Sequence, residues 1–137
     1  MSCLCRAMTP SLTLLGILLM PIAQAGAFEL SGAWATQADL CNQVFTKAGN
    51  TIEFAELSDL FGSGFVIDGN RIRGKAAKCT INSTKQDGEN IELTASCATS
   101  IMNQNVRFSL KVVNDDTINR IFPEISGMTL NYSRCKF

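Results

Sequence analysis

Four cysteines constrain the fold of this chain more than any other feature, because they lie far apart within residues 26–137: Cys41, Cys79, Cys97 and Cys135. A zinc site needs close cysteine pairs or nearby histidines, and the chain contains no histidine. A thioredoxin-like redox site needs a C-x-x-C motif, which is also absent. The expected use of these cysteines is therefore two structural disulfides, with no metal and no cofactor.

The start of the chain has the layout of a secretory signal peptide. Arg6 supplies the positive start, an apolar stretch follows, and Ala23-Gln24-Ala25 matches an A-x-A cleavage pattern. A membrane span needs roughly 20 apolar residues, and Pro21 interrupts this stretch. We therefore expect cleavage after Ala25 or Ala27 and no membrane span in the cleaved protein.

Cleavage during export would divide the chain into a signal peptide and a mature domain. We expect residues 1–25 to be the signal peptide and residues 26–137 to form a single β-rich domain. The domain would lie in the periplasm or be secreted, where an oxidising environment allows disulfides to form.

The pairing of the cysteines can be argued from the predicted hairpin between Cys79 and Cys97. Asp87-Gly88-Glu89 is a strong turn signal, and a three-residue loop there places Cys79 directly opposite Cys97. Alternation would place Ile91, Leu93, Ala95 and Cys97 on the buried face of the second strand. A two-residue turn would shift the register by one residue and lose the match.

We therefore favour the disulfide Cys79–Cys97, with Cys41–Cys135 as its partner. The main rival is Cys41–Cys79 with Cys97–Cys135, because four cysteines allow three connectivities.

The remaining pattern predicts one helix followed by short strands. Residues 34–50 carry a near capping box at Thr36 and Asp39, an apolar helical face, and a stop at Gly49-Asn50. After them, short alternating runs are separated by turn signals such as Asp68-Gly69-Asn70. We predict a mainly β fold, a small antiparallel β-barrel or sandwich of seven to eight strands with one N-terminal helix and two disulfides.

The sequence offers no firm catalytic motif, and we expect the protein not to be an enzyme. Ser–His and Cys–His nucleophiles are excluded because histidine is absent. The acidic residues fall at turns or on outward strand positions, where surface solvation explains them. The segment Phe61–Phe65, FGSGF, lacks the frame of a phosphate-binding loop.

A basic cluster is the one charged feature of interest. On an extended strand Arg71, Arg73 and Lys75 would point the same way, beside the loop that contains Ser63 and Gly64. This stripe is either a solvated strand face or a docking surface for an acidic partner. Nucleic acid is not expected as a partner, because the formal net charge is zero.

The signal, the size, the cysteine-stapled β-rich body and a Ser-Gly loop resemble the small bacterial periplasmic inhibitors of c-type lysozymes. That family presents a Ser-Gly-x-x-Tyr loop from an eight-stranded barrel, and Ile67 and Leu130 stand at the tyrosine position of two such segments here. The family's second motif, Tyr-x-x-Gly, is absent. The chain also resembles uncharacterised small secreted proteins of alphaproteobacteria, which share a Gly-x-Trp start (Gly32, Trp34) and a Tyr-x-x-Cys end (Tyr132, Cys135).

The resemblance implies an exported binding protein with a protein partner, most concretely a c-type lysozyme. Ser63 and Gly64 would enter the enzyme cleft, and Arg71, Arg73 or Lys75 would approach its carboxylates. Two alternatives stay open: a secreted host-interaction factor or envelope-associated structural protein, and a lipocalin-like carrier of a small apolar ligand. The sequence leaves the oligomeric state open.

Overall fold

The computed structural model describes residues 26–137, so the expected signal peptide at 1–25 lies outside the described residues. Its elements are β1 (Gly32–Ala35), η1 (Ala38–Leu40), α1 (Cys41–Val44), β2 (Phe45–Ala48), β3 (Thr51–Phe54), η2 (Ser58–Phe61), β4 (Gly64–Asp68), β5 (Arg71–Arg73), β6 (Lys78–Asp87), β7 (Asn90–Ala98), β8 (Asn103–Asn114), β9 (Thr117–Phe122) and β10 (Met128–Cys135). Among these residues, none of the helices combines the length and the apolar character that a membrane crossing requires.

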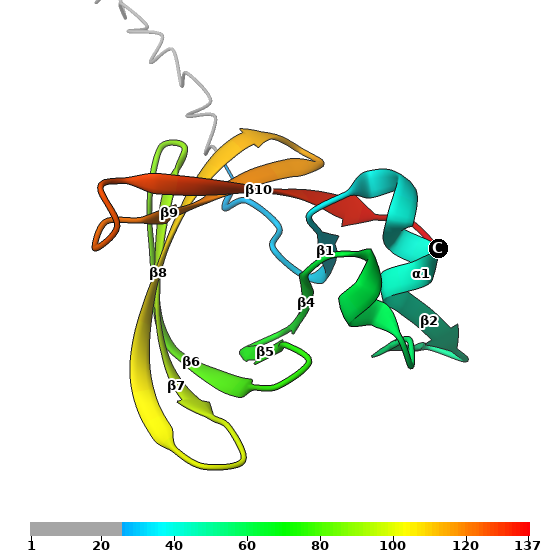
Figure 1. The fold of residues 1–137 in the computed structure, drawn as a ribbon. Helices are drawn as coiled ribbons and strands as arrows, with labels where there is room; N and C mark the ends of the chain where they lie inside the picture. Colours follow the sequence, from blue (N-terminus) through cyan, green and yellow to red (C-terminus); the bar gives the residue numbers. More distant parts are fainter. Residues whose placement is uncertain (1–25) are drawn as a thin grey trace, which may run out of the picture.

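Eight of the strands close into an antiparallel barrel in the order β1-β10-β9-β8-β7-β6-β5-β4 (Figure 1). The last strand closes the ring on the first, because β1 pairs with β10 on one side and with β4 on the other. This confirms the predicted mainly β fold and decides between the two predicted architectures in favour of the barrel.

Strand alternation fills the barrel with apolar side chains. Ile91, Leu93, Ala95 and Cys97 of β7 are all buried, as their spacing predicted. They meet Trp34, Ile118 and Tyr132 from the other side of the ring. Burial of these side chains provides the main driving force for closing the barrel.

A second, smaller core lies on the outer face of the barrel. The chain leaves the barrel after β1, forms η1, α1, the β2–β3 hairpin and η2, and returns at β4. Val44 and Phe45 pack there against Ala33, Ala35 and Val66, which point outward from β1 and β4. Figure 1 shows this excursion beside the barrel rather than within its ring of strands.

The predicted helix exists but is much shorter than predicted. Trp34 lies in β1, regular α-helix covers only Cys41–Val44, and residues from Phe45 onward form β2. Thr36 caps no helix, because its hydroxyl instead contacts the backbone of Ser63 on the return strand's loop. A tertiary contact has replaced the local capping interaction.

Both favoured disulfides are present. Cys79 pairs with Cys97 across β6 and β7, with Cα atoms 4.0 Å apart, and Cys41 pairs with Cys135, with Cα atoms 5.6 Å apart. The first lies inside the barrel, and the second ties α1 to the end of β10. Two disulfides are typical of chains that fold in an oxidising compartment.

The three-residue loop predicted between β6 and β7 is wrong. Asp87 pairs with Asn90, so the loop is the two-residue Gly88-Glu89, which alone would shift the register. A bulge between Ile81 and Ser83 restores it further along β6.

Candidate functional site

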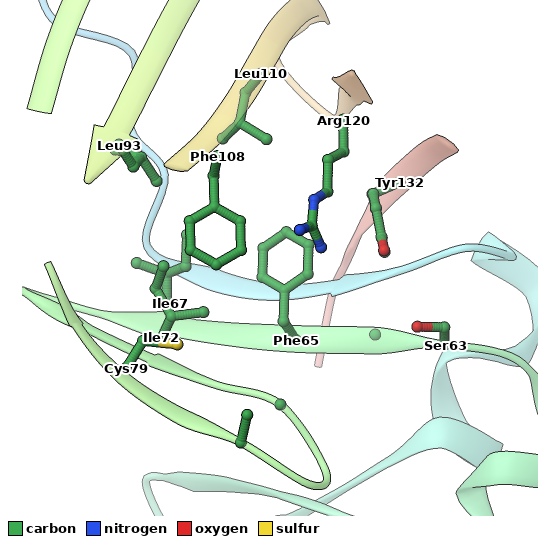
Figure 2. A pocket seen from close by; sticks show the side chains of 13 residues that line it. Ser63, Phe65, Ile67, Ile72, Cys79, Leu93, Phe108, Leu110, Arg120 and Tyr132 are labelled. Carbon is green, nitrogen blue, oxygen red and sulfur yellow. The ribbon is translucent and has the colours of Figure 1, made fainter. Parts of the chain in front are cut away.

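The barrel contains a cavity of about 180 Å³ that opens to solvent. Its walls come from β4 to β10 and from the loops beside them: Ser63, Gly64, Phe65, Ile67, Ile72, Gly74, Ala77, Cys79, Leu93, Phe108, Leu110, Arg120 and Tyr132. An engineered cavity of about 150 Å³ in another protein binds benzene, so this volume suits a single small organic molecule. Figure 2 shows how the side chains converge on the space.

The opening lies at one end of the barrel. Since neighbouring strands are antiparallel, the start of β4 and the loops after β5, β7 and β9 all lie at this end. Ser63, Gly64, Gly74 and Ala77 belong to this end, whereas Leu93 and Leu110 lie deeper among the core residues.

The opposite end is closed by the segment that precedes β1. Phe28 and Leu30 of this segment pack against the barrel core, and the Phe28 amide donates to Gln86 Oε1 at 3.0 Å. Arg134 donates to the carbonyl oxygens of Glu29 and Ser31 at 2.6 and 2.7 Å. The view in Figure 1 places this segment (blue) within the ring of strands. The segment before β1 therefore covers this end of the barrel.

Arg120 is the one charged residue among the side chains that line the cavity. It occupies an inward position of β9, between Ile118, which is buried, and Phe122, which is partly buried, and points into the space (Figure 2). Its guanidinium carbon lies 4.6 Å from the ring centroid of Phe108 and 4.5 Å from that of Phe122. The two aromatic rings hold the cation in place through cation–π attraction.

The guanidinium of Arg120 has no anionic partner within the described part of the chain. The side chain is partly buried, yet residues 26–137 supply no carboxylate within 4.0 Å of it and no hydrogen-bond acceptor. Arg71, Arg73 and Arg134 each have a carboxylate neighbour. A partly desolvated charge without a counter-ion is unfavourable, so this position favours an anion from outside the chain.

Tyr132 presents a second polar group to the cavity. Its side chain is buried at 3% exposure, its ring packs edge-on against Phe65 at 4.9 Å, and its hydroxyl bonds to none of the described residues. Residues 26–137 contain no fully buried side-chain oxygen or nitrogen without a hydrogen-bond partner. The Tyr132 hydroxyl must therefore face accessible space, where it can donate to or accept from a ligand.

Ser63 and Gly64, which the sequence singled out, border the cavity opening. Ser63 is fixed by its backbone, because its amide donates to Thr36 Oγ1 at 3.1 Å and its carbonyl accepts from the Thr36 amide at 2.9 Å. A side chain at Gly64 would collide with Phe45 and with the Trp34 carbonyl. The glycine therefore has a packing role in this fold.

The three predicted basic residues are not gathered into one stripe. Arg71 and Arg73 do share the outer face of β5, but Lys75 lies in the loop beyond the strand. Arg71 adjoins the β4–β5 turn at the opposite end of the barrel from Ser63.

Two of these cations hold the excursion against the barrel. Arg73 pairs with Glu53 at 3.1 Å and donates to the Ile52 carbonyl at 2.7 Å. Lys75 pairs with Asp59 at 3.1 Å and donates to Ser58 Oγ at 2.9 Å. Of these three cations, Arg71 has the weakest contact: its carboxylate neighbour Asp68 is 3.9 Å away, and both side chains are exposed to solvent.

Arg120 was not among the site residues predicted from the sequence. The signal was present in residues 117–122, where strict alternation places Arg120 on the same face as Ile118 and Phe122. An arginine at an inward position of an apolar strand face is uncommon and points to a partner for its charge. No group of three or more potential metal-ligating side chains occurs within residues 26–137.

Comparison of the chain with protein-family models, curated proteins and solved structures finds no match. The fold and the cavity therefore define the class: a disulfide-stapled, closed eight-stranded antiparallel barrel with a ligand-sized interior space.

Proposed function

We propose that this chain is an exported binding protein that holds a small, largely apolar ligand in the barrel cavity. The observation that carries the proposal is a cavity of about 180 Å³ whose walls are mostly aliphatic and aromatic, open at one end and closed at the other. Eight-stranded barrels have interiors just wide enough to be filled or to hold one small ligand. Placement in the periplasm or outside the cell is part of the proposal, supported by the two disulfides.

Binding would follow from burial of apolar surface. A ligand that fills the space between Leu93, Leu110 and Phe108 loses contact with water, at about 25 cal/mol for each Å² of apolar area. The walls are held by the barrel ladder and by the Cys79–Cys97 disulfide, so little ordering of the protein would oppose binding.

The test is calorimetric titration of the oxidised protein with 1-hexanol, a probe of suitable size. Ala77 lines the opening and Ala76 is an exposed neighbour outside the lining, so Ala77→Trp and Ala76→Trp form a matched pair. We expect saturable binding that Ala77→Trp abolishes and Ala76→Trp preserves. Absence of binding to the wild-type protein, or equal binding by both variants, would overturn the proposal.

Lysozyme inhibition remains a second proposal, and one observation favours it. Ser63 and Gly64 lie at the open end of an eight-stranded barrel, the arrangement that the resemblance implies for an inhibitory loop. Arg73 and Lys75 would first have to leave Glu53 and Asp59 before they could approach an enzyme carboxylate. Titration against a c-type lysozyme, with reduced and alkylated protein as control, tests it; no inhibition at large molar excess removes it.

A further inference from the structure

The geometry points to a more specific ligand: we propose that the cavity takes a monoanionic amphiphile, a small apolar carboxylate whose carboxyl group pairs with Arg120. This inference rests on the proposed ligand-binding function and deepens it. Three observations carry it: the position of Arg120, the absence of a counter-ion within the described residues, and the apolar walls beside it.

The position of Arg120 suits a head-group site. It occupies an inward position of β9 directly opposite Leu110 of β8, and Phe108 and Leu93 form the next inward pair of β8 and β7. A carboxyl group beside the guanidinium would therefore leave the apolar tail of the ligand in contact with Phe108, Leu110 and Leu93. Figure 2 shows Arg120 within the same space as Phe65, Phe108 and Tyr132.

The rings of Phe108 and Phe122 fix the guanidinium before any ligand arrives. Each centroid lies within 4.6 Å of Arg120 Cζ. A guanidinium held in this way loses little side-chain entropy on binding, and its planar set of N–H donors matches the two oxygens of a carboxylate. The free hydroxyl of Tyr132 adds one further hydrogen bond from the same wall.

Charge count selects a monoanion. Arg120 is the only cation among the cavity-lining residues, so a dianionic phosphate would bring one negative charge more than this wall can neutralise. Arg73 and Lys75, which flank the lining residue Gly74, are already paired with Glu53 and Asp59. Lys78, which follows Ala77, is exposed and precedes the inward-facing Cys79 on β6. A carboxylate therefore fits better than a phosphate monoester.

Arg134 shows by contrast what a structural arginine looks like in this barrel. It also points inward, stacks on Trp34 at 4.3 Å, and lies 3.7 Å from Asp116. Its guanidinium donates to three backbone carbonyls, those of Glu29, Ser31 and Asp115. Arg120 has the aromatic contacts but none of the acceptors, and the bound carboxylate would supply them.

The test compares three unbranched probes with six carbon atoms each: hexanoate, 1-hexanol and hexylammonium, titrated calorimetrically at neutral pH. Hydrogen bonds to charged groups contribute about 1.5–3 kcal/mol, which corresponds to a preference of about 10- to 150-fold for hexanoate over 1-hexanol. We expect hexylammonium not to bind, because its charge repeats that of Arg120. Arg120→Gln should remove the preference and leave the affinity for 1-hexanol unchanged, whereas Arg107→Gln, on an exposed position, should change neither.

The outcomes separate this inference from the proposed function. If wild-type protein binds hexanoate and 1-hexanol equally, the carboxylate assignment is wrong and the apolar cavity stands. If neither probe binds, both proposals fail. The probe comparison on the wild-type protein needs no variant, so a poorly folded Arg120→Gln protein would not prevent the decision.

Discussion

Gly64 lies so close to Phe45 that a Cβ atom on the glycine would come within 2.7 Å of Phe45 Cζ and within 2.7 Å of the Trp34 carbonyl oxygen. Phe45 is almost fully buried and anchors the excursion on the outer face of β1 and β4. The contact explains why a glycine begins β4, since any side chain would separate the excursion from the barrel.

Gly64→Ala should therefore destabilise the protein by about 1–3 kcal/mol, the usual cost of overpacking. Gly74→Ala is the control, because a Cβ there would meet only the Ala77 carbonyl at 3.6 Å, an ordinary contact. Urea unfolding measures both. Phe45→Ala removes the ring that a Cβ atom on residue 64 would meet. The free energies of unfolding lost in Gly64→Ala and in Phe45→Ala should therefore not add in the double variant. Equal stability of Gly64→Ala and Gly74→Ala would show that the packing account is wrong.

The two disulfides close loops of different length, with sequence separations of 94 for Cys41–Cys135 and 18 for Cys79–Cys97. On the chain-entropy account, removal costs about 4.5 kcal/mol for the longer loop and about 3 kcal/mol for the shorter. We expect the Cys41→Ser/Cys135→Ser protein to unfold at lower denaturant concentration than the Cys79→Ser/Cys97→Ser protein. The reverse order would mean that local contacts outweigh loop closure here.

The barrel could be predicted from sequence because its strands and turns are specified by patterns within short stretches of the chain. Alternation in residues 91–97 and 106–112, and turn signals such as that before Arg71, specify strands and their inward faces. The pairing of Cys79 with Cys97 was predicted correctly, but from a three-residue loop that the structure does not have; the bulge after Ile81 restores the register that the prediction needed.

The excursion could not be predicted, because tertiary contacts determine it. Residues 41–48 have a helical apolar pattern, but the chain continues as strand from Phe45, whose ring packs against Phe54 of the neighbouring strand β3 and against Gly64 of β4. Arg120 was missed as a site residue for a related reason. Alternation places Arg120 inward, but only the assembled barrel shows that no carboxylate among residues 26–137 reaches it.

Asn82 is the extra residue of the bulge in β6, since Ser83 pairs with Thr94 and Ile81 with Ala95. Deletion of Asn82 should produce a regular ladder that keeps Cys79 opposite Cys97. Deletion of Thr94 from the partner strand should instead shift the register and separate the cysteines. Peptide mapping of the oxidised proteins decides: the native Cys79–Cys97 bridge is expected in the first deletion and not in the second. Loss of the bridge in both would contradict this assignment of the extra residue.

Glu29, in the segment before β1, is expected to make the stability of the protein depend on pH. The folded protein lowers the pKa of Glu29, chiefly because its carboxylate accepts the Ser31 amide at 2.7 Å, with further contributions from the Ser31 hydroxyl and the charge of Arg134. A lowered folded pKa stabilises the protein above the ordinary carboxyl range, and the contribution is lost as the pH falls through the folded pKa.

Glu29→Gln should therefore lower stability slightly at about pH 7 and not at about pH 3, as measured by urea unfolding. Glu124→Gln, at an exposed position in the β9–β10 turn, serves as the control. A deficit that persists unchanged in acid would show that the carboxylate charge is not the cause.

Arg134 should be the residue that keeps the closed end of the barrel closed. Its guanidinium joins the carbonyls of Glu29 and Ser31, at 2.6 and 2.7 Å, to the barrel wall. Arg134→Gln removes the charge and most of these donors, and we expect a loss of about 1–3 kcal/mol because the carbonyls lose their partners. Arg107→Gln, at an exposed position of β8, is the matched control.

Hydrogen exchange distinguishes a local from a global effect of Arg134→Gln. If the segment opens by itself, the Phe28 amide, which donates to Gln86, should lose protection while the amides of β7 keep theirs. The indole N–H of Trp34, which donates to the Leu30 carbonyl at 2.9 Å, should exchange faster as well. Opening this end would turn the cavity into a channel through the barrel, so the affinity for 1-hexanol should fall with the protection of Phe28. Retained protection at Phe28 in Arg134→Gln would show that the apolar contacts of Phe28 and Leu30 close the barrel without the arginine.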